Sequence, residues 1–353
     1  MTPFTRSIVS TPRLDMNVWT SGPEDGLPLL MVHGNLSSGG FWKYVAAELP
    51  DDIRVIAPDM RGFGRTEAKP VDATRGLKDM SDDVHGLLEV LGLGGQPVNA
   101  VGWSMGAGVL MEQLIAHPGD LASMTFLAPI SPFGFGGTIN AEGTMAYADG
   151  FADGAGTGGG GANAEFVRRL LVKDDTEFVP MTSPRVTMRT YFGAQDNAAA
   201  IDEDFLVEEL LRVKISDQHY PGNSLPSLNW PMIAPGDKGI NNAMSPKYFN
   251  TTAILDAPAK PPITWLFGSQ DQISSNRSMF DFGMLGMLGV VPGWPGPLVY
   301  PAQPMEDQTR FVLNQYAERG GKVREVPLAG IGHGIPLAVP DRVAEEILQT
   351  MVR

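Results

Sequence analysis

Short apolar runs alternate with helical patterns along two stretches of this chain, which flank a long interruption. Apolar runs of strand length predict buried strands, and apolar residues spaced three or four apart predict helices. The first stretch predicts strands at residues 27–34, 53–59, 97–103 and 123–130 and helices at 77–93 and 105–117. The second predicts strands at 261–271 and 322–334 and helices at 305–321 and 340–352. Strands that alternate with helices indicate an α/β protein, with a mostly parallel central sheet and helices on both faces.

The alternation breaks between about residues 132 and 261. This segment holds a Gly-rich tract at 149–165, many prolines and helix-like pieces near 164–172, 184–192 and 202–212. A structureless connector of that length would be unusual inside a compact domain. We therefore expect an α/β core made of residues 1–131 and 262–353, interrupted by a largely helical cap of residues 132–261. Within the cap we expect the Gly-rich tract to be a mobile loop.

The composition excludes several classes of protein. Hydrophobic residues make up 43% of the 353 positions, so the chain can bury a large core. The formal net charge is −14 and no run of Lys and Arg occurs, which argues against a nucleic-acid partner, since phosphate binding needs concentrated positive charge. The chain has no cysteine, which excludes disulfides, thiolate chemistry and Cys-ligated metal sites.

The sequence also suggests where the protein works. Its N-terminal residues have no apolar core of signal-peptide length. The longest apolar stretch, residues 282–294, is too short to span a bilayer and is broken by Gly and Pro. We therefore expect a cytoplasmic protein without a membrane span. The oligomeric state is left open by the sequence.

The segment "VNAVGWSMGAGVLMEQLIAH" places Ser104 between two glycines, where a predicted strand runs directly into a predicted helix. This G-x-S-x-G pattern is typical of a nucleophile elbow, a sharp turn that exposes the serine hydroxyl above the sheet. The alternative is that Ser104 is only a small residue in a tight turn. The local sequence fits both interpretations, so the choice depends on whether a base and an acid can be found elsewhere.

A serine nucleophile needs a histidine base, and the base needs a carboxylate that orients it. In the hydrolase order the serine comes first, then the acid, then the histidine. Of the five histidines, His333 alone follows the last predicted strand, and it leads toward the final helix. Asp271 lies just past the strand that follows the cap, where catalytic groups of parallel sheets gather. A solvated turn carboxylate is the alternative for Asp271.

Several motifs in this order resemble those of the α/β-hydrolase family. They are "HGN" at 33–35 with the aromatic pair Phe41-Trp42 downstream, "PDMRGFGRT" at 58–66, "GWSMG" at 102–106, "GSQD" at 268–271 and "GIGHG" at 330–334. The resemblance covers most of the chain outside residues 132–261 and about 275–302. It implies that Ser104 is the nucleophile, His333 the general base and Asp271 the group that orients the histidine.

The resemblance also implies an oxyanion hole made of two backbone N–H groups. One would belong to Met105, after the serine, and the other to Asn35, with Leu36 as the alternative. We weigh Leu36 and Trp103 as candidate pocket-lining residues, and for Trp103 core packing is an equal alternative. His33 is expected to brace the oxyanion loop rather than to transfer protons.

Two further expectations concern residues near the elbow. Asp59 and Arg61, in the 58–66 motif, are expected to organise a loop beside it. Relatives that open epoxides or displace halides carry Asp at the elbow, so Ser104 argues against both reactions. The histidines are scattered in sequence, no metal-binding spacing such as H-E-x-x-H occurs, and we expect neither a metal nor a cofactor.

The leading functional hypothesis is a cofactor-independent serine hydrolase that cleaves a carboxylic ester or lactone of a hydrophobic small molecule. The apolar segment 277–305 suggests an adaptable pocket wall, with packing between core and cap as the alternative. The same triad could instead hydrolyse a carbon–carbon bond or an amide, or transfer an acyl group. A small-molecule receptor that keeps the pocket but turns over negligibly is the hypothesis from a different class.

Overall fold

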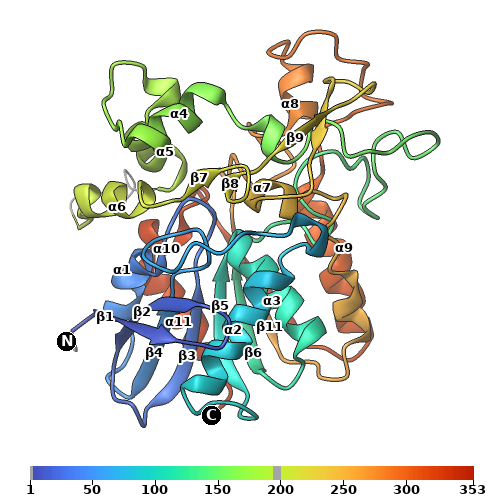
Figure 1. The fold of residues 1–353 in the computed structure, drawn as a ribbon. Coiled ribbons are helices and arrows are strands. Elements are labelled where there is room, and N and C mark those ends of the chain that lie inside the picture. Colours follow the sequence, from blue (N-terminus) through green and yellow to red (C-terminus); the bar gives the residue numbers. More distant parts are fainter. Residues whose placement is uncertain (1–2, 194–199) are drawn as a thin grey trace.

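The computed structural model describes residues 3–193 and 200–353. At its centre lies an eight-stranded sheet with the order β1-β2-β4-β3-β5-β6-β11-β12 (Figure 1). The strands β4, β3, β5, β6, β11 and β12 are parallel to one another, whereas β1 and β2 form a hairpin at one edge, in which β2 is antiparallel to β4. The bounds are β1 Thr5–Ser10, β2 Asp15–Ser21, β3 Leu27–Val32, β4 Ile53–Pro58, β5 Val98–Trp103, β6 Leu121–Leu127, β11 Ile263–Gly268 and β12 Val323–Leu328.

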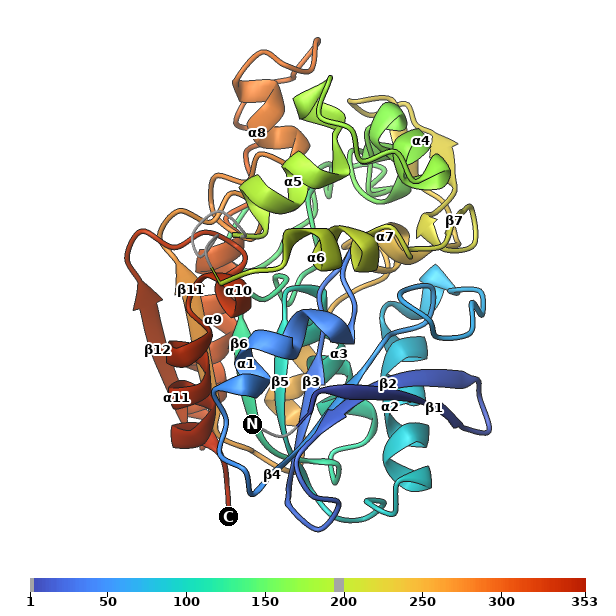
Figure 2. The ribbon, with the colours of Figure 1, turned by 90° about the vertical axis from the view of Figure 1, so that its left-hand side faces the viewer.

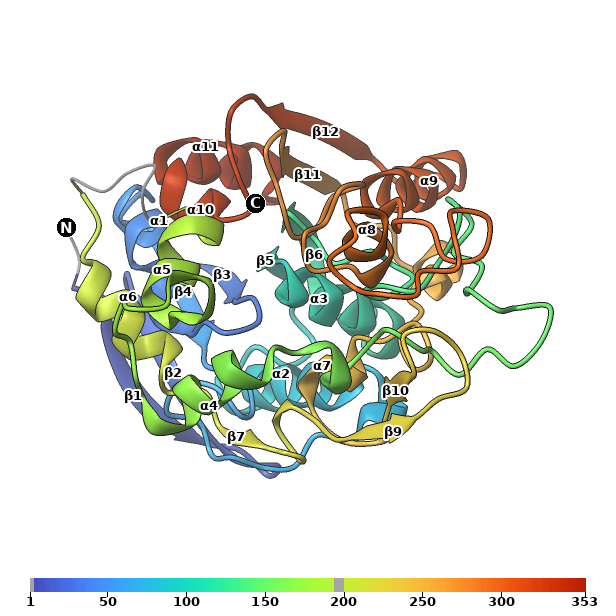
Figure 3. The same ribbon diagram turned by 90° about the horizontal axis from the view of Figure 1, so that it is seen from above.

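Helices cover both faces of the sheet, as the alternating pattern predicted. Figure 3 shows α1 and α11 on one face and α2, α3 and α9 on the other. The bounds of the core helices are α1 Lys43–Ala47, α2 Lys78–Val90, α3 Met105–Ala116, α9 Met305–Glu318, α10 Ile335–Ala338 and α11 Pro340–Thr350. Each helix and strand predicted outside residues 132–261 is present, with ends that shift by a few residues. None of the described helices is both long and apolar enough to cross a membrane.

The hairpin β1–β2 has no counterpart in the predicted elements. All of β1 lies on the surface or half-buried, because it forms the edge of the sheet and packs on one neighbour alone. An edge strand of this kind carries no run of apolar residues, and the sequence pattern therefore does not reveal it.

Most of the segment between β6 and β11 lies beyond the carboxyl ends of the parallel strands, whereas its last part, with the 3-10 helix Thr252–Asp256, returns beside α3 and α9 (Figures 1 and 2). The three helices predicted in it are confirmed, and it also holds a short fourth helix and two small two-stranded sheets. The bounds are α4 Ala164–Val172, α5 Pro184–Tyr191, α6 Glu203–Leu210, α7 Ile240–Ala243, β7 Ile215–Ser216, β8 Tyr220–Pro221, β9 Ser224–Pro226 and β10 Ile233–Pro235. Short 3-10 helices lie at Gly39–Trp42, Ala73–Arg75, Gly159–Gly161, Pro180–Thr182 and Thr252–Asp256.

The Gly-rich tract at 149–165 is a loop over most of its length, but its centre is buried rather than exposed. The Gly156 N–H donates to Ile233 O at 2.8 Å, and the Gly159 N–H donates to Asn242 Oδ1 at 2.7 Å. Gly158 has a φ of +74°, and a Cβ there would lie 2.2 Å from Asn242 Oδ1. The glycines are therefore required by close packing, which the composition alone cannot distinguish from flexibility.

The apolar segment 277–305 contains α8 (Phe282–Met287) and packs against the same layer (Figure 1). Tyr300 is fully buried, its ring lies 5.0 Å from that of Trp230, and its hydroxyl donates to Ala155 O at 2.7 Å. Other apolar side chains of the segment face outward, among them Val290 and Leu298. Packing against other segments therefore explains the burial of Tyr300, but it does not explain the outward-facing apolar side chains of residues 277–305.

Candidate active site

Ser104 lies in the turn between β5 and α3, with φ 55° and ψ −117°. This backbone conformation is unfavourable for a non-glycine residue and persists only where the surroundings impose it. The two flanking glycines are essential to the turn. A Cβ on Gly102 would lie 2.6 Å from the Ala107 nitrogen, and a Cβ on Gly106 would lie 2.1 Å from Val32 O. The sequence therefore folds into the sharp strand-to-helix turn that the motif predicted.

Asp271 and His333, 62 positions apart in the chain, are brought together by a hydrogen bond of 2.9 Å between Asp271 Oδ2 and His333 Nδ1. The other carboxylate oxygen, Oδ1, accepts from the N–H groups of Ile273 at 2.7 Å and Ser274 at 3.0 Å. Both side chains are buried. With Nδ1 donating to a fixed carboxylate, the other ring nitrogen, Nε2, is left as an acceptor.

Backbone hydrogen bonds between two loops create this pairing. The Ser269 N–H donates to Leu328 O at 3.0 Å, and the Gln270 N–H donates to Ile331 O at 2.9 Å. A Cβ on Gly268 would lie only 2.2 Å from Ile331 O, so the loop after β12 can approach the end of β11 because residue 268 is glycine. Parallel neighbouring strands thus deliver the acid and the imidazole to the same edge of the sheet.

Trp103 connects the elbow with the histidine. Its indole N–H donates to His333 O at 2.9 Å, and the two rings lie 5.8 Å apart. Over residues 3–193 and 200–353, no hydrogen bond joins the Ser104 hydroxyl to His333. Trp103, the residue before Ser104, therefore links the elbow to the loop that carries His333.

The loop after β3 lies directly against the elbow. A Cβ on Gly34 would lie 3.2 Å from Ser104 Cβ, so the loop passes closely over the serine. The Leu36 N–H donates to Asn35 Oδ1 at 3.0 Å and is already used. Among the described residues, the backbone N–H groups of Asn35 and Met105 have no acceptor. Of the two alternatives for the first oxyanion donor, Asn35 is therefore the better supported.

His33 is held in the interior beneath this loop. Its Nε2 accepts from the Met60 N–H at 2.9 Å, and its Nδ1 lies 2.7 Å from Gly34 O. Burial lowers the pKa of His33 to about 4, and the hydrogen bond to Gly34 partly offsets this. The neutral imidazole uses one nitrogen as donor and the other as acceptor, and it ties the loop after β3 to the loop after β4.

Asp59 and Arg61 bind the loop beside the elbow. Asp59 accepts from the Gly39 and Arg65 N–H groups, both at 2.8 Å, and burial raises its pKa to about 6 against the effect of these bonds. Arg61 forms a two-pronged contact with Asp83 on α2, at 2.6 and 2.7 Å. Asp59 thus joins the backbone at Gly39 to that at Arg65, and Arg61 ties the loop to α2.

Leu36 and Trp103, the candidate pocket-lining residues, are 8% and 1% exposed. The Trp103 ring packs edge-on against Phe192 at 5.5 Å and lies 6.0 Å from Phe41. Phe192, at the end of α5, also lies over the histidine loop, because a Cβ on Gly334 would meet Phe192 O at 1.6 Å. The sequence pattern gave no sign of this contact between the segment 132–261 and the site.

The structure brings together histidines that are far apart in the sequence. The rings of His85 and His117 stack at 3.9 Å, and these residues and Asp120 could offer ligand atoms within 4.8 Å of one another. His85 Nδ1 is paired with Asp120 at 2.9 Å, and His117 Nε2 with Asp82 at 3.2 Å. In stacked parallel rings the in-plane lone pairs do not converge on one point. Each imidazole also already has a carboxylate partner of its own. The group lies at the far end of α3 from Ser104.

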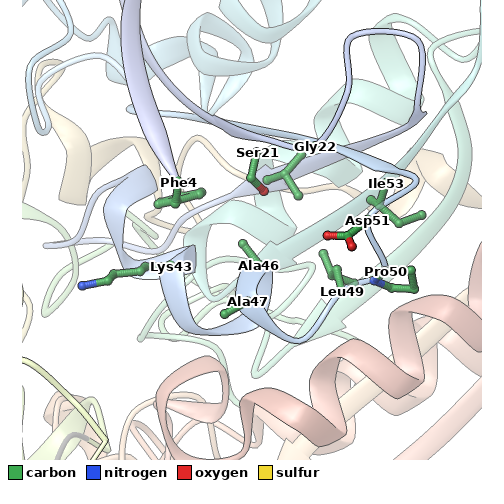
Figure 4. Close-up of a pocket in the computed structure, with 11 residues that line it drawn as sticks. Phe4, Ser21, Gly22, Lys43, Ala46, Ala47, Leu49, Pro50, Asp51 and Ile53 are labelled. Carbon is green, nitrogen blue, oxygen red and sulfur yellow. The ribbon is translucent and has the colours of Figure 1, made fainter. Parts of the chain in front are cut away.

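A hollow of about 420 Å³ opens elsewhere on the core (Figure 4). It is bounded by the start of β4 at Ile53, the end of β2 at Ser21, and residues of α1. This is the amino end of β4, whereas Ser104, Asp271 and His333 follow the carboxyl ends of β5, β11 and β12. The hollow is therefore separate from the three candidate catalytic residues.

Comparisons with known proteins agree with this architecture. The family model described as "alpha/beta hydrolase fold" matches residues 28–282. The chain is 38% identical over 96 residues to a 2-hydroxymuconate semialdehyde hydrolase of Pseudomonas sp. (strain CF600), a match that covers 26% of this chain and 33% of the relative. It is 32% identical over 120 residues to a cis-3-alkyl-4-alkyloxetan-2-one decarboxylase of Xanthomonas campestris pv. campestris, which covers 30% and 40% respectively.

These matches span less than half of the relatives' length. Among solved structures, an esterase, RhEst1, from Rhodococcus sp. ECU1013 superposes with a TM-score of 0.57 at 18% identity, over 99% of this chain and 98% of that one. At this identity the likeness concerns the fold. The sheet order, the serine turn and a family match over most of the sequence lead to one conclusion: the chain belongs to the α/β-hydrolase fold family.

Proposed function

We propose that the protein is a serine hydrolase that cleaves a carboxylic ester or lactone of a hydrophobic small molecule through Ser104, His333 and Asp271. The observation that carries the proposal is the 2.9 Å hydrogen bond between Asp271 and His333 at the edge of the sheet where the strained Ser104 turn lies. A structural role alone would not require a buried imidazole and carboxylate at the same edge of the sheet as a strained serine turn.

In the proposed reaction His333 Nε2 takes the proton of Ser104 as the hydroxyl oxygen attacks the acyl carbonyl. Asp271 accepts the hydrogen bond from Nδ1–H, which fixes the tautomer and stabilises the imidazolium. The imidazolium then protonates the leaving alcohol, and water releases the acyl group by the same steps in reverse. Contacts between nucleophile and base often tighten only when substrate is bound, which is consistent with the absence of a Ser104–His333 bond in the described residues.

The negative charge on the tetrahedral intermediate would be held by the N–H groups of Asn35 and Met105. Met105 is the first residue of α3, so the positive end of the helix dipole supports the same charge. Removal of one donor of this kind typically costs about 3 kcal/mol of transition-state stabilisation.

We further propose that residues 132–261 form a cap that covers this site and selects the substrate, with residues 1–131 and 262–353 as the core. The Phe192 contact with Trp103 and Gly334 supports a cap that reaches the triad. The apolar surroundings of the site favour a hydrophobic substrate. A cytoplasmic location is part of the proposal, and cell fractionation would test it.

A carbon–carbon bond hydrolase is the second candidate, favoured by the similarity to the semialdehyde hydrolase. The similarity to a protein named for an oxetan-2-one, a four-membered lactone, favours lactones in the leading proposal. Acyl transfer would appear as product partitioning when an alcohol competes with water. A receptor would be stabilised thermally by its ligand without consuming it.

The decisive experiment assays the wild type and Ser104→Ala with panels of esters, lactones and carbon–carbon substrates, and labels both with a fluorophosphonate probe. Turnover and labelling are expected in the wild type and not in Ser104→Ala. Ser7→Ala, on the exposed strand β1, is the matched control and should behave as the wild type. A wild type that is folded yet neither labelled nor active on any panel would refute the proposal.

A further inference from the structure

The proposed oxyanion loop is bonded to a residue of α7, in the segment 132–261. Asn35 Nδ2 donates a hydrogen bond of 3.1 Å to Asn241 Oδ1, across 206 positions of the sequence. Both side chains are half-buried, as is Ser104. This polar contact joins the loop beside the serine to the layer above it, as does the 2.7 Å bond from Ser38 Oγ to Glu209 farther along the loop.

Asn241 stands on a rigid support. The next side chain, Asn242, accepts from the Gly159 N–H at 2.7 Å and donates to Asn223 O at 2.7 Å and Lys238 O at 2.6 Å. On the core side, the Gly239 N–H donates to Val71 O at 3.0 Å. Because α7 is fixed on both sides, Asn241 sets the position of Asn35 rather than following it.

Asn35 is held at both ends of its amide. Its Nδ2 is bound by Asn241, and its Oδ1 accepts the Leu36 N–H at 3.0 Å. Leu36 has a φ of 54°, which is unfavourable for a leucine and needs external support. The side-chain bonds therefore fix the backbone around the Asn35 Cα, which carries the N–H proposed as an oxyanion donor.

The amide of Asn241 has a second buried neighbour. Tyr220 is buried, which raises its pKa to about 12, and the Asn241 side chain partly offsets that rise. The Asn241 side chain thus interacts with a buried phenol and is hydrogen-bonded to Asn35, and both contacts favour one orientation of its amide. Such preorganisation is what an oxyanion donor requires.

We propose that Asn241 is a positioning residue that acts through Asn35 to align the oxyanion donor. This rests on the proposed function, because it assigns a role at the same site. A merely structural role for Asn241 would lower thermal stability and leave the catalytic step of the folded enzyme unchanged. A positioning role lowers kcat with little change in KM, and its effect disappears once Asn35 has lost its side chain.

The test is a double-mutant cycle with Asn35→Ala, Asn241→Ala and the double variant, with kcat and KM measured on the best ester or lactone together with the rate of fluorophosphonate labelling. Each single variant is expected to lose on the order of tenfold in kcat, the value of one hydrogen bond of 1.4 kcal/mol. The double variant should be no slower than the slower single variant. Asn229→Ala, which removes a bond to Phe151 O in the same segment, is the control and should retain full kcat.

Two results would overturn the inference. One is a folded Asn241→Ala with the kcat of Asn229→Ala, and the other is a double variant whose loss is the product of the two single losses. Where Asn241→Ala does not fold, Asn35→Ala breaks the same hydrogen bond from the core side, and an unchanged kcat there has the same meaning. Ser104-dependent turnover in the wild type separates this failure from that of the proposed function, since without such turnover both proposals fall.

Discussion

The indole N–H of Trp103 donates a 2.9 Å hydrogen bond to the backbone carbonyl of His333. The residue directly before the serine therefore holds the loop that carries the imidazole. The bond lies in the interior, where Trp103 is 1% and His333 3% exposed. Loss of the donor would leave the His333 carbonyl with the Ile335 N–H, at 3.0 Å, as its remaining partner, and one such hydrogen bond contributes roughly 0.5–1.5 kcal/mol.

Trp103→Phe should therefore weaken both the fold and the reaction. It keeps an aromatic ring beside Phe192 and removes the N–H, so we expect a loss of roughly 0.5–1.5 kcal/mol in unfolding free energy and on the order of tenfold in kcat. Urea unfolding and ester kinetics would measure the two effects. Trp265→Phe is the matched control, since the Trp265 indole nitrogen is buried without a partner in the described part of the chain. Equal effects of the two substitutions on kcat would contradict the assignment.

Asp271→Asn tests the orientation of the histidine. The backbone N–H groups of Ile273 and Ser274 would still find an oxygen at position 271, so the loop should keep its shape. The new amide nitrogen would face His333 Nδ1 and favour the wrong tautomer, for which a loss of about 10⁴ in kcat is expected.

The measurement for this variant is steady-state kinetics beside a thermal melt. Asp341→Asn, on the surface at the start of α11, provides the control and should match the wild type in both. If Asp271→Asn retained more than about a tenth of the wild-type kcat with an unchanged melt, Asp271 would not be the orienting group.

The core and the candidate triad follow from the sequence because their signals are local. A buried strand such as β3 is an unbroken apolar run, and a helix such as α2 repeats its apolar residues every three or four positions. The parallel sheet then places residues after β5, β11 and β12 at one edge. That geometry makes Asp271 and His333 predictable from their places in the chain.

The contacts that the sequence does not reveal depend on tertiary packing. The Asn35–Asn241 bond and the stacking of His85 on His117 join segments whose sequences carry no mutual signal. The buried Gly-rich tract reads as a flexible loop because glycine serves equally for mobility and for close approach. In each case a specific neighbour decides the outcome.

Two glycines in helices allow a direct test of this distinction. In α3, a Cβ on Gly106 would lie 2.1 Å from the Val32 carbonyl oxygen, whereas in α2 a Cβ on Gly86 would meet only Arg13 Cδ at 3.8 Å. Helix propensity favours alanine at both positions by roughly 0.5–1 kcal/mol. Gly86→Ala should therefore stabilise the protein by about that amount.

For Gly106→Ala the backbone clash outweighs the helix propensity. We expect a loss of roughly 3 kcal/mol or more in unfolding free energy, or failure to fold, because the serine turn must open to accept the methyl group. Chemical denaturation of both variants provides the comparison. Stabilisation by both substitutions would mean that the close approach of α3 to β3 does not exist in solution.

Glu112, which is 2% exposed on α3, links stability to pH. Burial raises its pKa from about 4.5 to about 7, and the charge of Lys78 partly offsets the rise. At a pH between these two pKa values the folded protein keeps a proton that the unfolded chain has released. The free energy of unfolding therefore falls as the pH rises from about 4.5 to about 7, and it levels off above pH 7. With each pKa unit worth about 1.4 kcal/mol, the ionised group costs the fold up to ~3 kcal/mol.

Glu112→Gln replaces the carboxyl group with a neutral amide of the same size. It should leave the unfolding free energy near pH 4.5 almost unchanged and raise it at pH 8 by up to ~3 kcal/mol, since the ionised side chain no longer has to be buried. Urea denaturation at the two pH values measures the difference, with Glu318→Gln at the exposed end of α9 as the control. An equal effect of Glu112→Gln at both pH values would show that the buried carboxyl group does not titrate in this range.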